Sequence, residues 1–117
     1  MLIVLTEIAS ISIDCPAVIQ LAIGMNLDIK QPGLMSQLRN DCCTSNNNPD
    51  TSYYILPFVK CNSGNRVTEL HWYSLKLDGF IDEMSIPPLL TRLTLYSNKL
   101  KGSLPDTWPT GLTSLDV

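Results

Sequence analysis

The chain has 117 residues, of which 44% are apolar and 16% are charged, and its net charge is −3. This composition is typical of one globular domain and excludes a disordered chain. Because no run of lysine or arginine could neutralise phosphate groups, we expect no binding to nucleic acid or to an acidic membrane surface. The sequence has no stretch of about 20 apolar residues, so no segment is predicted to span a bilayer.

Residues 1–13, which begin MLIVLTEIAS, are mainly apolar and have small residues near their end. This pattern resembles the apolar core of a secretory signal peptide. A basic segment at its start is missing, however, and Glu7 interrupts the apolar run. We therefore expect a degenerate or truncated signal peptide, with a first β-strand or an unstructured start as the alternatives.

Residues 14–66 are expected to form a mainly helical unit that ends in a hairpin. A helix is predicted over residues 14–27, with Asp14 capping free backbone N–H groups and Pro16 in the first turn. The segment Gln31-Pro32-Gly33 predicts a turn, after which residues 34–38 predict a second, shorter helical segment.

A loop and two strands follow. Residues 44–52 are rich in Asn, Ser, Asp and Pro, which favour local hydrogen bonds to their own backbone and therefore predict a loop. Residues 53–61 and 66–75 have the pattern of β-strands, and the short segment Asn62–Asn65 joins them. This arrangement predicts a β-hairpin.

The chain has four cysteines, and four cysteines allow three pairings: they are Cys15, Cys42, Cys43 and Cys61. Adjacent cysteines such as Cys42 and Cys43 very rarely bond to each other, because the small ring is strained. A zinc site with His71 as a further ligand is the alternative, but a Cys-Cys doublet lacks the spacing that zinc ligands usually have. We therefore predict two disulfides in an oxidising compartment and no metal site.

Residues 67–117 contain a repeated pattern. The segment Leu90–Gly102 reads L-x-x-L-x-L-x-x-N-x-L-x-G, and a variant of it begins at Val67. A third, incomplete copy begins at Leu112, at nearly the same offset. Self-similarity at about 20–29 residues is the signature of leucine-rich repeats. The sequence therefore predicts two full repeats and a truncated third.

Each recurring type of residue in the repeat has an expected physical role. Alternate leucines such as Leu93 and Leu95 should point inward from a short strand. Asn98 is expected to hydrogen-bond backbone groups of the neighbouring copy where the chain leaves the strand. Gly102 would permit a backbone conformation or a close approach that other residues resist, and Pro105 would fix a change of chain direction.

The segment Leu90–Trp108, LTRLTLYSNKLKGSLPDTW, resembles the plant-type extracellular leucine-rich repeat. Upstream, Asp14-Cys15, DCC at residues 41–43 and VKCNSGNRVTEL resemble the cysteine-bearing N-terminal cap of receptor-like kinases, receptor-like proteins and polygalacturonase-inhibiting proteins. The resemblance implies an α/β fold: a leucine-rich repeat solenoid, which is a right-handed β/α superhelix, with a helical, disulfide-bonded N-terminal cap. It also implies the pairings Cys15–Cys42 and Cys43–Cys61.

The same resemblance implies a non-enzymatic recognition module, the N-terminal part of a secreted or ectodomain protein that binds protein, peptide or carbohydrate ligands and needs no cofactor. Such proteins bind through the concave face of their sheet. We expect His71, the only histidine, to be a solvated surface residue, because no serine or cysteine triad can be assigned around it. The candidate ligand-binding residues are Glu69, His71, Tyr73, Arg92, Thr94 and Tyr96, with Ser114 and Asp116 in the third copy.

The sequence ends within the third copy, which suggests an incomplete gene model. The alternative function is therefore a purely structural capping fragment, or a piece that self-associates through an uncapped C-terminal edge. An unpaired strand edge favours such association because it offers free backbone hydrogen-bonding groups to another chain.

Overall fold

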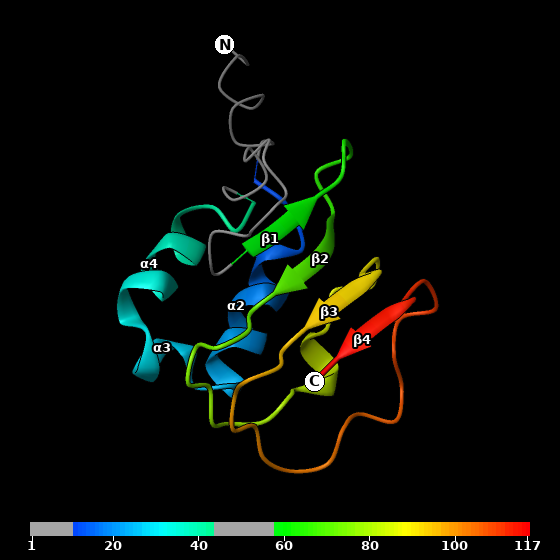
Figure 1. The fold of residues 1–117 in the computed structure, drawn as a ribbon. Coiled ribbons are helices and arrows are strands. Elements are labelled where there is room, and N and C mark those ends of the chain that lie inside the picture. Colours follow the sequence, from blue (N-terminus) through cyan, green and yellow to red (C-terminus); the bar gives the residue numbers. More distant parts are fainter. Residues whose placement is uncertain (1–10, 44–57) are drawn as a thin grey trace.

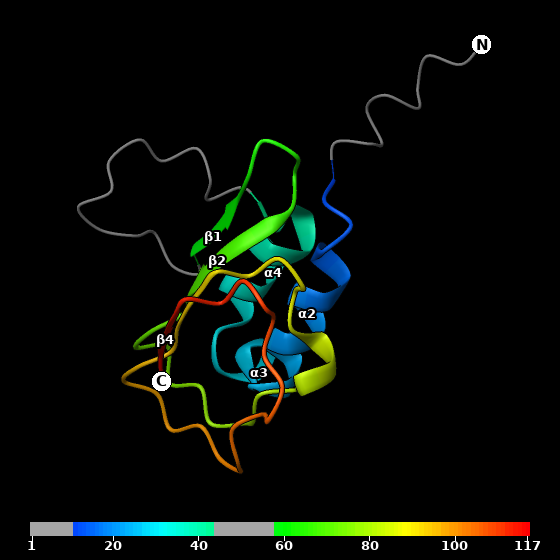
Figure 2. The ribbon, with the colours of Figure 1, turned by 90° about the vertical axis from the view of Figure 1, so that its right-hand side faces the viewer.

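The computed structural model describes residues 11–43 and 58–117. The predicted signal peptide lies outside the described residues up to residue 10, and so does the predicted loop at residues 44–52. The elements are α2 (Cys15–Gly24), α3 (Leu27–Lys30), α4 (Pro32–Asn40), β1 (Phe58–Cys61), β2 (Val67–His71), the 3-10 helix η2 (Glu83–Ser85), β3 (Arg92–Thr94) and β4 (Ser114–Asp116). Figure 1 shows the strands side by side in this order, with α2 behind them. Figure 2 shows that α2, α3 and α4 lie on one side of the sheet.

Helix α2 is apolar along most of its length and buries Val18 and Leu21 completely. The predicted capping role of Asp14 is wrong, because its side chain makes no cap hydrogen bond. Its carboxylate instead accepts hydrogen bonds from Arg66 Nε at 2.8 Å and from the Val67 N–H at 2.9 Å. A buried carboxylate is stabilised more by a guanidinium than by neutral donors alone. Asp14 therefore ties the start of α2 to the start of β2.

The predicted turn at Gln31-Pro32-Gly33 is right only for Gln31, the non-helical residue between α3 and α4, because Pro32 and Gly33 are the first residues of α4. A proline is tolerated there because the first N–H groups of a helix have no partner within the helix. A further turn lies between α2 and α3, where Asn26 has a φ of 66°. Asparagine enters this left-handed conformation more readily than most residues.

Strands β1 and β2 form the predicted hairpin: they are antiparallel, with Val59 opposite Leu70. Both implied disulfides are confirmed, Cys15–Cys42 with a Cα–Cα distance of 5.5 Å and Cys43–Cys61 with 5.8 Å. The first disulfide joins the start of α2 to the segment that follows α4, and the second joins that segment to β1. The helices and the hairpin are therefore linked covalently.

The predicted leucine-rich repeat solenoid is wrong. The described residues form three α-helices and a four-stranded mixed sheet, which the views in Figures 1 and 2 show as a short sheet that does not curl into a superhelix. The connection from β2 to β3 contains only the three-residue η2, and the connection from β3 to β4 contains no helix. A repeat is stable only against its neighbours, and a superhelix needs several repeats to accumulate its rotation. The two short connections of this sheet do not provide the repeated rotation that a superhelix needs.

The repeated leucines nevertheless lie next to one another, because β2, β3 and β4 pair in parallel. Leu70 lies beside Leu93, and Leu93 lies beside Leu115. Leu70 and Leu93 are fully buried, whereas Leu115 is 38% exposed. Trp72, which replaces a leucine of the pattern, is also fully buried. The core therefore lies between the helices and strands β1 to β3 and becomes thinner toward β4.

Asn98 fixes the chain where it leaves the sheet. Its Oδ1 accepts hydrogen bonds from the N–H groups of Leu75 and Leu77, at 2.9 and 3.1 Å. Its Nδ2 donates to the carbonyl oxygens of Trp72 and Leu95, both at 2.8 Å. The four bonds use the full capacity of one amide group and hold the segment after β2 against the segment after β3.

Candidate recognition surface

The outward side chains of the sheet form rows across the strands, because residues paired in register point to the same face. The first row is Lys60, Glu69, Arg92 and Ser114, and the second contains His71, Thr94 and Asp116. A third row lies just beyond the strands and consists of Tyr73 and Tyr96. The sequence-predicted residues are thus brought together on one surface, which we call the outer sheet face.

Tyr73 and Tyr96 stack on each other, with ring centroids 4.9 Å apart and an interplanar angle of 13°. The backbone continues in register beyond the strands, since Trp72 N donates to Thr94 O at 2.8 Å and Ser74 N donates to Tyr96 O at 3.1 Å. Tyr96 is 41% exposed and Tyr73 is half-buried. The pair therefore presents ring edges, hydroxyl groups and outer ring surfaces to a ligand, while the two inner ring faces cover each other.

Arg92 is an exposed cation near the middle of the outer sheet face, whereas the exposed Lys60 lies on its outermost strand. It lies in register with Glu69, yet its guanidinium makes no hydrogen bond or ion pair with any residue of the described ranges 11–43 and 58–117. Glu69 is engaged elsewhere, by His71 Nε2 at 2.9 Å and by Lys60 Nζ at 3.8 Å. The guanidinium of Arg92 is consequently available to a carboxylate or carbonyl of a ligand.

The expectation that His71 is solvated is wrong, because its side chain is only 3% exposed. The imidazole shares a hydrogen bond with the Glu69 carboxylate, and Thr94 lies beside it in the sheet. A buried, hydrogen-bonded histidine offers little surface to a ligand. The accessible part of the outer sheet face therefore includes Tyr73, Arg92 and Tyr96, with Thr94 half-buried between them, and the exposed Lys60 and Asp116 at its edges.

A cluster of lysines, which sequence reasoning missed, lies where the chain leaves the sheet. Lys30 Nζ is 3.0 Å from Asp78 Oδ2, and Lys76 and Lys99 line the same pocket of about 500 Å³. Lys101 lies near enough to act on the charge of Asp78. We call these four lysines and Asp78 the lysine corner. The signal that could have found it is the repeat offset, because Lys76 and Lys99 occupy the same position in two successive copies of the pattern.

Asp78 is held as a carboxylate within this corner. Hydrogen bonds from Asn26 Nδ2, at 2.8 Å, and from Lys30 lower the pKa of its carboxyl group. Desolvation raises the pKa by a smaller amount, whereas the positive charges of Lys30 and Lys101 lower it further. The corner therefore carries four positive charges and one negative charge near neutral pH.

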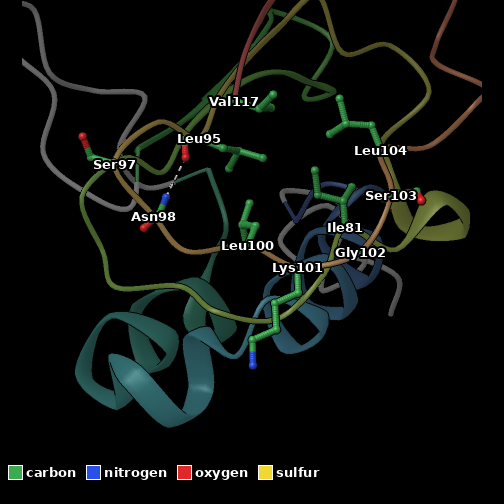
Figure 3. Close-up of a pocket in the computed structure, with 10 residues that line it drawn as sticks. All are labelled: Ile81, Leu95, Ser97, Asn98, Leu100, Lys101, Gly102, Ser103, Leu104 and Val117. Atoms are coloured by element: carbon green, nitrogen blue, oxygen red, sulfur yellow. Dashed lines mark hydrogen bonds between the residues drawn. The ribbon is translucent and has the colours of Figure 1, made fainter.

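A second hollow of about 270 Å³ lies next to β4 and has both apolar and polar residues in its lining. Figure 3 shows Leu95, Leu100, Leu104 and Val117 around it, with the Lys101 side chain directed away. Leu104 and Val117 are each 50% exposed. This hollow lies where the apolar residues next to β4 are no longer covered by another layer of the structure.

The sulfur atoms of Cys15, Cys42 and Cys43 lie within 4.8 Å of one another. Each of them is part of a disulfide, so none offers a thiolate to a metal ion in this state. Pro105 is half-buried, and Gly102 has a φ of 77°, a left-handed conformation that favours glycine.

Among the helices that the structure describes, none is both long and apolar enough to cross a bilayer. Comparisons with protein-family models, with curated proteins and with solved structures give no match. The two disulfides indicate an oxidising environment such as the outside of the cell. The function is therefore argued from the outer sheet face and the features around it.

Proposed function

We propose that the chain is a non-enzymatic recognition module that binds a protein or peptide through its outer sheet face. The observation that carries the proposal is the stacked pair Tyr73–Tyr96 on the same face as Arg92, which is exposed and makes no ion pair with any residue of the described ranges. Tyrosine and arginine are the residue types most enriched, with tryptophan, at binding hot spots, because they combine contact area with directional polar groups. Three of them gathered on one face favour a binding role.

The arrangement of the rings supports a polypeptide ligand more than a carbohydrate. Tyr73 and Tyr96 use one ring face each on their partner, so less aromatic face is left for a sugar to stack on. Ring edges, hydroxyl groups and a guanidinium suit the amides and side chains of a polypeptide. The sequence motifs that resemble extracellular leucine-rich repeat proteins also favour a recognition role, and we propose a relationship to that family on those motifs alone.

We further propose that the module acts outside the cell, either as a secreted protein or within an ectodomain. Two disulfides in a small chain support this, because such bonds persist in oxidising compartments and are reduced in the cytosol. They also stiffen the part of the molecule against which the outer sheet face is built, since Cys61 belongs to β1.

The test begins with selection of binding peptides from a random displayed library, using the whole chain as bait. The selected peptide is then titrated against the variant Tyr73→Ala/Arg92→Ala/Tyr96→Ala. We expect binding to weaken at least about thirtyfold, because truncation of even one hot-spot residue costs about 2 kcal/mol or more. Ile29→Ala/Arg39→Ala/Met84→Ala is the matched control, since it truncates an equal number of exposed side chains away from the face. Equal affinity of the two variants, or a library without binders, contradicts the proposal.

Self-association is a second candidate function, and the open side of β4 favours it. Within the described residues β4 pairs with β3 alone, so one side of its backbone is unpaired. Leu104, Leu115 and Val117 are 38–50% exposed along this side. Sedimentation velocity over a hundredfold concentration range tests the idea. A mass that rises with concentration, and stays monomeric in Leu115→Lys, supports it; a monomer throughout contradicts it.

A further inference from the structure

We infer that the lysine corner selects an acidic segment of polypeptide, and that this segment belongs to the same ligand that contacts Tyr73 and Tyr96. The inference rests on the proposed function and names the chemistry of its ligand. The chain has five lysines and a net charge of −3. Four of those five lysines lie in the lysine corner, so positive charge is concentrated there against the overall charge of the molecule.

Most of this charge is not neutralised within the described part of the chain. Lys30 pairs with Asp78, whereas Lys76, Lys99 and Lys101 make no ion pair with any described residue. All three are exposed. Like charges held close together repel one another, and a ligand carboxylate between them relieves that repulsion. The corner therefore attracts an anion.

The lysines are held in place by the backbone rather than carried on a loose loop. Lys99 N donates to Leu77 O and Lys101 N donates to Gly79 O, both at 2.7 Å. The segment after β3 therefore runs alongside the segment after β2. Lys76 has a φ of 62°, a left-handed conformation that is uncommon for residues other than glycine. The neighbouring N–H groups of Leu75 and Leu77 are fixed by Asn98. A conformation of this kind is kept only where its surroundings determine it.

Two chain segments lead from the outer sheet face to the lysine corner. Lys76 closely follows Tyr73 in the sequence, and Lys99 follows Tyr96 at the same spacing. Adjacent segments of a sheet lie about 5 Å apart, so the two tyrosines lead to two lysines in the same order. A ligand that lies along the strands meets the aromatic pair first and the ammonium groups next.

The charge pattern favours acidic polypeptide over sulfated polysaccharide or free phosphate. Asp78 remains a carboxylate among the lysines and repels a ligand of dense negative charge. Alternate carboxylates of an extended peptide are about 7 Å apart on one face, so they can reach separate ammonium groups without approaching Asp78. Ser97, exposed on the rim of the same pocket, adds a hydroxyl donor that suits a peptide carbonyl or carboxylate.

The experiment uses the peptides that the displayed library yields against the whole chain. We expect them to be enriched in Asp and Glu next to an apolar residue. Lys76→Gln and Lys99→Gln should each weaken their binding up to about fivefold, and the double variant about tenfold, as expected for exposed ion pairs. Arg39→Gln is the matched control, because it also removes one positive charge from an exposed position but lies outside the corner. It should change affinity less than about twofold.

Two results would overturn the inference. Selected peptides without acidic enrichment, whose binding Lys76→Gln/Lys99→Gln leaves unchanged, would show that the corner does not contact the ligand. Displacement of an acidic peptide by inorganic phosphate at equal molarity, or tighter binding of dextran sulfate that depends on both lysines, would make the corner a site for other anions. Failure here is separable from failure of the proposed function. If binding requires Tyr73, Arg92 and Tyr96 but neither lysine, the proposed function stands and the inference about the lysine corner fails. If binding requires the lysines but not those three residues, the corner binds an acidic ligand and the proposed function of the outer sheet face fails.

Discussion

The first and last strands of the parallel part of the sheet have the same sequence pattern but different surroundings. Leu70 in β2 is completely buried beneath the helices and the hairpin, whereas Leu115, which occupies the same repeat position in β4, is 38% exposed. Trp72 and Val117 differ in the same way, at 0% and 50% exposure. The comparison shows that a repeated apolar residue contributes to a core only as far as another layer covers it.

The two ends also differ in what holds them together. The region around β1 and β2 is stabilised by two disulfides and by the ion pair of Asp14 with Arg66. The region around β3 and β4 contains no cysteine and is held by the packing of Leu93 and Leu95, by backbone hydrogen bonds and by the Asn98 amide. Unfolding should therefore begin at β4 and reach the disulfide-bonded region last.

The largest expected effect distinguishes buried from exposed leucines. Leu93→Ala should lower the free energy of unfolding by about 3 kcal/mol, because the removed side chain leaves a cavity in a packed core. Leu115→Ala, the matched change one strand further, should cost about 1 kcal/mol, since part of that side chain already contacts water. Urea denaturation of both variants measures the difference. Equal losses would show that β4 is covered as well as β3.

A second pair of variants compares two glycines at the same repeat position. A Cβ at residue 79 would overlap the carbonyl oxygen of Gly24 and lie 2.9 Å from Met25 Cα, so Gly79→Ala should force the segment after β2 away from α2 and cost about 3 kcal/mol. At Gly102 the nearest atom would be 3.8 Å away, so Gly102→Ala should cost only about 1 kcal/mol through its φ of 77°. Thermal unfolding followed by circular dichroism measures both. A larger loss for Gly102→Ala would contradict this assignment.

The glycines illustrate how far sequence reasoning reached. The repeat offset identified Gly102 as special and gave the partners in the parallel sheet, because register follows directly from a fixed spacing. It gave no sign that Gly79, in the equivalent position, is needed for close contact with α2. Contacts between an element of the repeat and a helix that is distant in the sequence leave no periodic signal.

The errors have related causes. The solenoid was inferred from a local motif, but the motif specifies strands and turns and does not specify how many layers follow. Asp14 has the sequence position of a helix cap, but its carboxylate binds the guanidinium of Arg66, which is distant in the sequence. The lysine corner was missed because Lys30 lies far from the repeat in the sequence and only the fold brings it near Lys76 and Lys99, whose shared repeat position was the one available signal. His71 has the alternation of an outward residue, and its burial depends on neighbours outside its strand.

The ion pair of Asp14 with Arg66 predicts a pH dependence confined to the disulfide-bonded region. Burial alone would raise the pKa of Asp14, but the hydrogen bonds from Arg66 and Val67, together with the charge of Arg66, lower it below its ordinary value of 3.8. The stabilisation is therefore complete above the unfolded pKa and is lost as the pH falls through the lower folded pKa. Asp14→Asn should cost about 2 kcal/mol at pH 7 and progressively less below about pH 4.

Urea denaturation of wild type and Asp14→Asn at pH 7 and pH 3 measures this difference. Asp41→Asn serves as the control, because its carboxylate accepts a hydrogen bond from the Cys43 N–H and forms no ion pair with any residue that the structure describes. A constant difference between wild type and Asp14→Asn at both pH values would show that the loss at pH 7 arises from packing rather than from charge.

The smallest expected effect concerns the aromatic pair on the outer sheet face, and it tests whether that face is rigid without a ligand. Offset aromatic pairs contribute about 0.5–1.5 kcal/mol beyond the area that they bury. In a double-mutant cycle, Tyr73→Ala and Tyr96→Ala should therefore show a coupling energy of about 1 kcal/mol in the free energy of unfolding. Tyr73→Ala with Thr94→Ala, which joins two neighbouring rows, is the control cycle and should show a smaller coupling.

The result decides how the face would bind. A coupling near about 1 kcal/mol means that the rings are already stacked in the unbound molecule, so little side-chain entropy is lost when a ligand arrives and the affinity benefits accordingly. A coupling near zero means that the rings move independently, and a ligand would then have to order both. In that case the outer sheet face where the chain leaves β2 and β3 would become organised only on binding, although the core beneath these strands is already packed.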